Sequence, residues 1–151
     1  MKRHQLVQHV LVVLAVVLLA MPRAWAEHQK AIDGMVINIG VVPASKAAKF
    51  PSETEKHGAT YTGGAQHILV SLSDAKTGGH IADARVTLEL RDPKGKSQKK
   101  LLMAGSTAGI PDYSEIFDFG SSGQYRIRVT IERQGGKRPV TADLKWQHVV
   151  N

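Results

Sequence analysis

Apolar and polar residues alternate one by one through several stretches of this chain. Residues 125–132, YRIRVTIE, carry an apolar side chain at every second position. Residues 84–91, ARVTLELR, repeat the pattern, and residues 27–151 show no apolar stripe at helical spacing. A period of two puts the apolar side chains on one face of a β-strand. The chain therefore has to bury one face of each strand, as two packed sheets do.

Seven strands are predicted from this pattern, separated by turns rich in Gly, Pro, Asp and Ser. They cover residues 35–42, 67–73, 84–91, 99–104, 113–119, 125–132 and 140–147. One short helical turn is expected around residues 44–49, and Trp146 should point inward with Leu144. Short strands at this spacing predict an all-β fold, a single immunoglobulin-like antiparallel β-sandwich with Greek-key connections. Tyr125, near the start of the penultimate strand, is expected to form a tyrosine corner.

The first residues have the three parts of a secretory signal peptide. Lys2 and Arg3 form a basic start, residues 10–21 are an apolar run, and AWA at 24–26 is a small-residue cleavage pattern. The run is shorter than the ~20 apolar residues that a membrane-spanning helix needs. We therefore predict a signal peptide at 1–26, a single exported domain at 27–151 and a periplasmic location. The alternative is an uncleaved membrane anchor.

Composition excludes several classes of function. The chain has no cysteine, so disulfides, thiolate metal sites and cysteine nucleophiles are excluded, and the fold depends on its core. Without the basic residues of the signal segment, the net charge falls from +7 to +4, and no basic block indicates nucleic-acid binding. Neither a nucleophile elbow nor a phosphate-binding glycine loop is present, and the acidic residues are scattered singly. We expect no enzymatic activity.

A family resemblance is carried by the central run HILVSLSDAKTGGHIADARVTLELRDPKGK, followed by LLMAG, YSEIFDF and GQYRIRVTIER. Over residues 35–148 the chain resembles the small periplasmic β-sandwich proteins of the YtkA-like and FixH-like kind, and more loosely the CopC-type copper-binding domains. The resemblance implies a role in copper handling, with a copper-handling or respiratory-complex protein of the envelope as partner. It also implies histidines at the positions of His67 and His57 and a methionine at that of Met103.

The chemistry of these three residues agrees with that implication. Imidazole suits copper and zinc, and a thioether selects the softer Cu(I). His67 starts a predicted strand, His57 lies in the preceding connection, and Met103 lies in the predicted fourth strand. If that strand crosses the edge of the sheet, the three could form one Cu(I) site, whereas a core role for Met103 and a surface role for His67 are the alternatives.

Two further histidines are considered as ligands. His80 follows a turn at the far end of the strand that His67 begins, about 20 Å away, so the two cannot share an ion. Cleavage after residue 26 would put His28 second in the exported chain, where the terminal amine, an amide and the imidazole can chelate Cu(II). A flexible terminus without metal is the alternative there.

Two functions remain open on the sequence. The first is a periplasmic metal-binding accessory or chaperone-like module, with copper as the metal. The second is a non-catalytic envelope module that docks on a protein partner. Its contact would be a sheet face carrying Arg126, Arg128, Thr130 and Lys145, or the loop at 105–112.

Overall fold

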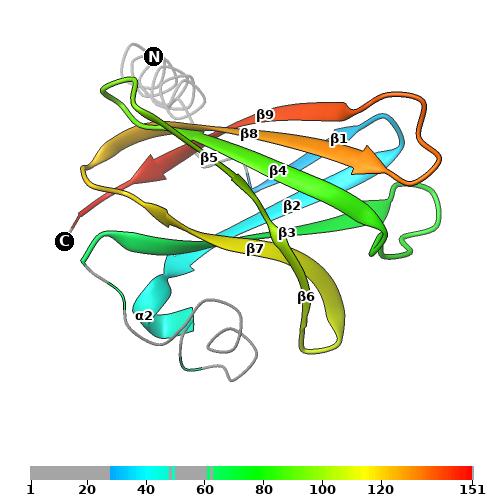
Figure 1. Ribbon diagram of the computed structural model, residues 1–151, viewed down its shortest axis with the longest axis horizontal. Helices are drawn as coiled ribbons and strands as arrows, with labels where there is room; N and C mark the ends of the chain where they lie inside the picture. Colours follow the sequence, from blue (N-terminus) through cyan, green and yellow to red (C-terminus); the bar gives the residue numbers. More distant parts are fainter. Residues whose placement is uncertain (1–27, 48, 50–60, 62, 151) are drawn as a thin grey trace, which may run out of the picture.

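The computed structural model describes residues 28–47, 49, 61 and 63–150. Two antiparallel sheets pack face to face, as Figure 1 shows. The elements are β1 (Gln29–Ile32), β2 (Met35–Pro43), α2 (Ala44–Ala47), β3 (Ala65–Asp74), β4 (Ala84–Arg91), β5 (Ser97–Leu101), β6 (Met103–Thr107), β7 (Ile110–Asp118), β8 (Gly123–Arg133) and β9 (Val140–His148). The predicted sandwich and the short helical turn are confirmed. The predicted signal peptide lies outside the described residues.

The order of the strands is that of an immunoglobulin-like Greek key. One sheet has the order β1-β2-β3-β7-β6 and the other β5-β4-β8-β9. Immunoglobulin domains pair strands A, B, E and D in one sheet and C′, C, F and G in the other. The strands from β2 onward take these eight places in chain order, and β1 is an addition at the edge. No disulfide joins the sheets, because the chain has no cysteine.

The described residues form nine strands, so the expected number of seven was too low. The first addition is β1, which pairs with β2 through a hairpin whose turn residues are Asp33 and Gly34. Both have positive φ angles, 47° and 75°, as a two-residue type I′ turn requires. The Asp-Gly pair is a strong hairpin signal that sequence reasoning missed, because the strand before it has only four residues.

The second addition arises because the predicted fourth strand at 99–104 is really two strands in different sheets. β5 ends at Leu101 beside β4, and β6 begins at Met103 beside β7. Leu102 lies between them, buried, and its amide donates to the carbonyl of Val86 at 2.8 Å. The chain therefore crosses from one sheet to the other at Leu102, where Figure 1 shows β5 running on into β6.

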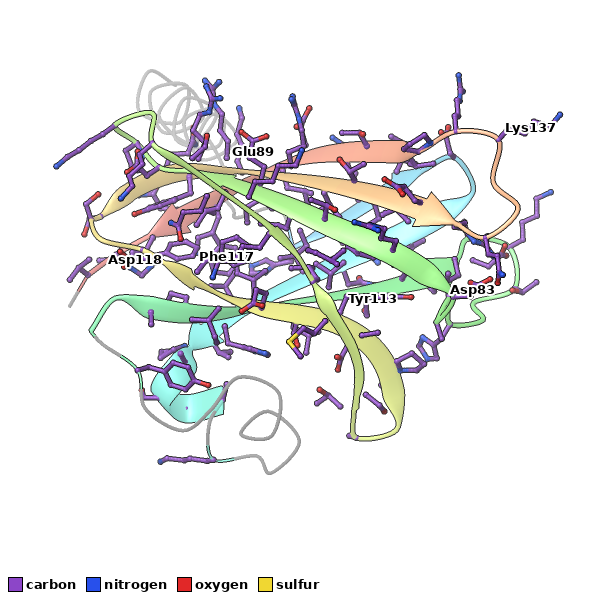
Figure 2. All side chains as sticks on the ribbon, in the orientation of Figure 1. Asp83, Glu89, Tyr113, Phe117, Asp118 and Lys137 are labelled. Atoms are coloured by element: carbon purple, nitrogen blue, oxygen red, sulfur yellow. The ribbon has the colours of Figure 1, made fainter. Side chains whose placement is uncertain are left out.

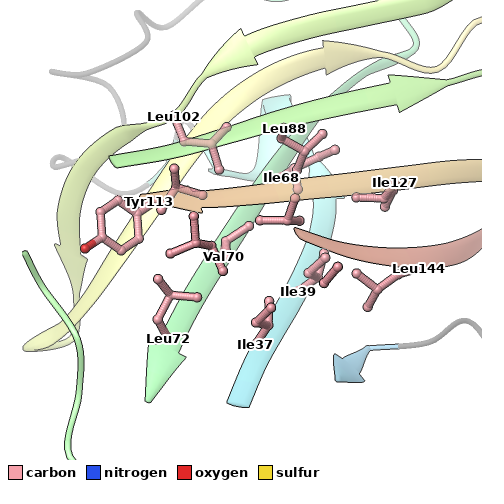
Figure 3. Packing of buried hydrophobic residues seen from close by; sticks show 14 of the residues in the cluster. Ile37, Ile39, Ile68, Val70, Leu72, Leu88, Leu102, Tyr113, Ile127 and Leu144 are labelled. Carbon is pink, nitrogen blue, oxygen red and sulfur yellow. The ribbon is translucent and has the colours of Figure 1, made fainter. Parts of the chain in front are cut away.

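The core lies between the two inner faces, where the alternating apolar residues meet (Figure 3). Ile37, Val70 and Leu72 of one sheet face Leu88 and Ile127 of the other. Trp146 lies in register with Tyr125 and packs against this core, although it is only partly buried. The predicted register of the last strand is therefore confirmed.

Two buried tyrosines tie loops to strands. The Tyr125 hydroxyl donates to the carbonyl of Ser121 at 2.9 Å, the expected tyrosine corner. The Tyr113 hydroxyl donates to the carbonyl of Ile81 at 3.2 Å and accepts from the amide of Ala84 at 3.0 Å. Tyr113 thereby connects β7 of one sheet with the segment that leads into β4 of the other. Burial raises the pKa of its hydroxyl, which keeps the proton that this bond needs.

Side chains also bridge the open sides of the sandwich. On one side, Gln98 of β5 makes two hydrogen bonds, at 2.7 and 3.0 Å, to the backbone of Asp118 in β7. On the other side, Lys30 of β1 donates to the carbonyl of Asp143 in β9 at 2.7 Å. These contacts occupy backbone groups at sheet edges, which would otherwise be open to pairing with another chain.

Within the described residues, no helix is long and apolar enough to cross a membrane.

Candidate metal centre

His67 is a buried histidine on the outer face of the five-stranded sheet. Its neighbours Ile68, Val70 and Leu72 alternate toward the core, so the His67 side chain projects to the other side of β3. It lies between Val42 of β2 and Ile116 of β7 and is only 3% exposed. The helix α2 packs against β3, on the side of the sheet away from the second sheet in Figure 1. From the sequence, a surface role for this strand-end histidine was the alternative to a ligand role, and its burial is a finding of the structure.

Met103 lies on the same outer face, at the edge of the sheet. It pairs with Ser114 of β7, while His67 pairs with Ile116 two residues further along that strand. One strand separates β3 from β6, so the strand spacing of about 4.8 Å and the two-residue offset put the two Cα atoms about 12 Å apart. At this separation an imidazole and a thioether share one ion only when both side chains lean toward each other over β7. Met103 is 42% exposed, so this end of the pair is open to solvent.

Two more buried polar residues, Ser114 and Asp112, line the outer face of β7 beside this pair. Both are almost fully buried, although they alternate with the inward residues Tyr113 and Phe117. His67, Ser114 and Asp112 all have interaction partners in the structure, as buried polar groups require. A histidine can use one ring nitrogen for a hydrogen bond and the other for a metal ion. The alternating pattern could have predicted from the sequence that these polar residues share one face of β7. It could not have predicted that this face is buried.

Of the other expected ligands, His28 and His80 do not lie on this face. His57 lies outside the described residues. His28 is exposed and its ring stands edge-on to Trp146 at 4.9 Å, so it lies on the side of the sheet that faces β9. The sheet itself separates His28 from His67. His80 pairs with Ser73 at the far end of β3 and is exposed, as expected.

The donor set at this face suits Cu(I) better than a hard ion. An imidazole and a thioether are soft or borderline ligands, whereas calcium and magnesium need several oxygens. The described residues contain no group of three or more His, Asp and Glu side chains that could hold a metal ion. His67 and Met103 alone therefore do not make a complete metal site, and at least one more ligand would have to join them.

His148, which was not among the ligands predicted from the sequence, lies at the same end of the sandwich as His67. Its ring packs against Phe119, with 5.0 Å between centroids, and edge-on to Tyr125 at 6.0 Å. It borders a hollow of about 520 Å³ together with Gln66 and Pro43. Burial lowers the pKa of His148 below its usual value, so the ring is neutral at neutral pH. Gln66 points toward this hollow while the next residue, His67, points to the outer face, so the two histidines are on different sides of the sheet.

Solved structures share this fold, although no family model and no curated protein sequence matches the chain. A DUF4426 family protein from Pseudomonas aeruginosa has a TM-score of 0.68 and 15% identity over 82% of this chain and 94% of that protein. FetP of uropathogenic E. coli strain F11, expressed in the periplasm, has a TM-score of 0.65 and 15% identity over 83% and 96%. The copper-reconstituted P19 protein of Campylobacter jejuni has a TM-score of 0.61 and 19% identity over 80% and 92%. A copper-bound FetP variant matches at a TM-score of 0.62 and 13% identity. At such identities the likeness establishes the fold, and each match spans nearly the whole of the other protein.

Proposed function

We propose that the protein is a non-catalytic periplasmic module that binds copper. It holds Cu(I) at the outer face of the five-stranded sheet and passes it to a copper-handling or respiratory-complex protein of the envelope. The observation that supports this most is that His67 and Met103 project from the same face of one sheet. Their strands are separated only by β7. Two solved proteins of the same fold, FetP and P19, carry copper. A closer kinship with the YtkA-like and FixH-like proteins is part of the proposal.

The proposed ligands are His67, Met103 and His57. Buried His67 would be the fixed ligand, because it lies between two neighbouring strands on the face of the sheet against which α2 packs. Half-exposed Met103 would be the ligand through which the ion enters and leaves. His28 is the secondary candidate, at the start of the exported chain and on the other side of the sheet.

Competition with a Cu(I) chelator tests the site. We expect Met103→Leu to weaken Cu(I) binding by about 10–100-fold or more, since loss of an outer-shell partner already costs that much. The same is expected of His67→Gln, which keeps a polar group at a buried position. Met103→Leu conserves volume at a half-exposed position, so the free energy of unfolding should change little.

His80→Gln is the matched control, since it removes an exposed histidine at the far end of the same strand. His28→Gln reports separately on the terminal site. Equal Cu(I) affinity in the wild type, Met103→Leu and His67→Gln would disprove the proposed ligand set. Loss in His28→Gln alone would transfer the proposal to the terminus.

The periplasmic location depends on removal of residues 1–26. We expect protein recovered from the periplasm to begin at Glu27, because the small-residue pattern ends at residue 26. Intact-mass spectrometry measures this directly. A mass that retains the apolar run at 10–21 would instead indicate a membrane anchor.

A further inference from the structure

Three basic side chains stand in one row across the outer face of the four-stranded sheet. Arg91 of β4 lies directly opposite Arg126 of β8, and Arg126 lies directly opposite Lys145 of β9. All three are exposed. Like charges directly opposite each other in a sheet are destabilising. This basic row (Arg91, Arg126 and Lys145) therefore costs the fold stability instead of contributing to it.

The neighbouring row shows how the same sheet balances its charges elsewhere. There Glu89, Arg128 and Asp143 lie opposite one another with alternating signs. Arg128 binds Asp143 with two hydrogen bonds, at 2.7 and 3.2 Å, and this contact holds the pKa of Asp143 below its usual value. Arg128, one of the residues named for a partner contact in the alternative function, is thus already paired within the protein.

The basic row is far less neutralised. Arg91 has one carboxylate within reach, Glu89 at 3.6 Å. In the described part of the chain, neither Arg126 nor Lys145 takes part in an ion pair. Figure 2 shows Glu89 on the side of this sheet that faces away from the other sheet.

A hollow of about 480 Å³ lies over these residues. Five basic and two acidic side chains line it together with Leu144. One of the basic residues, Lys30, comes from the other sheet and donates a hydrogen bond to the carbonyl of Asp143. The surface is therefore concave and carries an excess of three positive charges.

We propose that this hollow binds an acidic segment of a partner protein, an extended stretch with at least two carboxylates. The planar guanidinium groups of Arg91 and Arg126 match carboxylates in two-point contacts, and Lys145 adds a point charge. A concave site accepts a protruding chain, whereas the headgroups of a membrane form a plane. Moreover, the exposed large apolar residues that could enter a membrane, such as Leu101, Val149 and Val150, are not among those that line the hollow.

This surface is independent of the proposed copper site. The basic row is on the outer face of one sheet and His67 with Met103 on the outer face of the other, so the core separates them. A bound acidic segment would therefore not cover the face that carries the proposed copper ligands.

Fluorescence anisotropy with a labelled synthetic peptide of alternating Glu and Gly tests the proposal at low ionic strength. The double variant Arg126→Gln/Lys145→Gln should bind the peptide about tenfold or more weakly than the wild type. Wild-type binding should weaken as salt is added, because exposed charges are screened. The matched control is Lys137→Gln/Arg138→Gln, which removes one Lys and one Arg from the exposed turn between β8 and β9 and changes the net charge equally. It should bind within about twofold of the wild type.

Urea unfolding of both double variants verifies that they fold. A loss confined to the Arg126/Lys145 variant supports the proposal. Equal losses in both double variants would mean that net charge alone attracts the peptide and would overturn it, as would failure of the wild type to bind. Vesicles of equal parts phosphatidylcholine and phosphatidylglycerol are the second probe. If they bind through Arg126 and Lys145 while the peptide does not, the surface is a membrane contact and the proposal is wrong.

Discussion

Phe119→Ala should destabilise the protein by about 3–5 kcal/mol, as truncation of a large buried aromatic residue does. Phe119 is fully buried and stacks on Tyr125 with 4.5 Å between ring centroids. It also packs against His148, so its removal leaves a cavity at the end of the sandwich beside two ring systems. Urea unfolding followed by tryptophan fluorescence measures the loss.

Ile110→Ala is the control, because Ile110 is 46% exposed and its truncation should change the free energy of unfolding by about 0.5 kcal/mol or less. If Phe119→Ala costs no more than Ile110→Ala, Phe119 is not packed in the core as described.

Gly123→Ala should destabilise the protein by about 2–5 kcal/mol, the combined cost of a strained backbone and an overpacked contact. Gly123 starts β8 with a φ of 141°, a conformation that residues with a Cβ rarely adopt. A Cβ there would stand 2.6 Å from Cγ of Pro93, in the turn between β4 and β5. The same unfolding measurement applies.

Two further variants separate the two causes. Gly109 has a φ of 82° with open space around it, so Gly109→Ala should cost only the strain, about 1–2 kcal/mol. Pro93→Ala combined with Gly123→Ala should recover part of the loss, because it removes the atom that the new Cβ meets. If the losses of Pro93→Ala and Gly123→Ala simply add, the contact with Pro93 contributes nothing to the destabilisation.

Much of the architecture could be predicted from the sequence, because the period-two pattern is a property of each strand alone. The pattern identified the inward faces correctly, including that of Trp146, and the position of Tyr125 identified the tyrosine corner. The first hairpin was predictable in principle, since Asp33 and Gly34 are the residues that a two-residue turn requires.

Other features depended on contacts between segments far apart in the chain. Alternation assigns a face to each residue but not a sheet to each strand. The crossing at Leu102 therefore appeared only in the structure, where Leu102 donates to Val86 and the next residue pairs with β7. The placement of Met103 on the same face as His67 depends on that crossing.

The sequence by itself determined which side chains could share a face; the tertiary structure decided which of them meet and what covers them. His67 alternates away from the core and by that pattern alone would be exposed, yet it is buried on a face against which α2 packs. Arg91, Arg126 and Lys145 form one row only because three strands pair in one particular register. The register of paired strands and the burial of an outer face are set by contacts between whole elements. A local pattern of alternating residues therefore predicts neither of them.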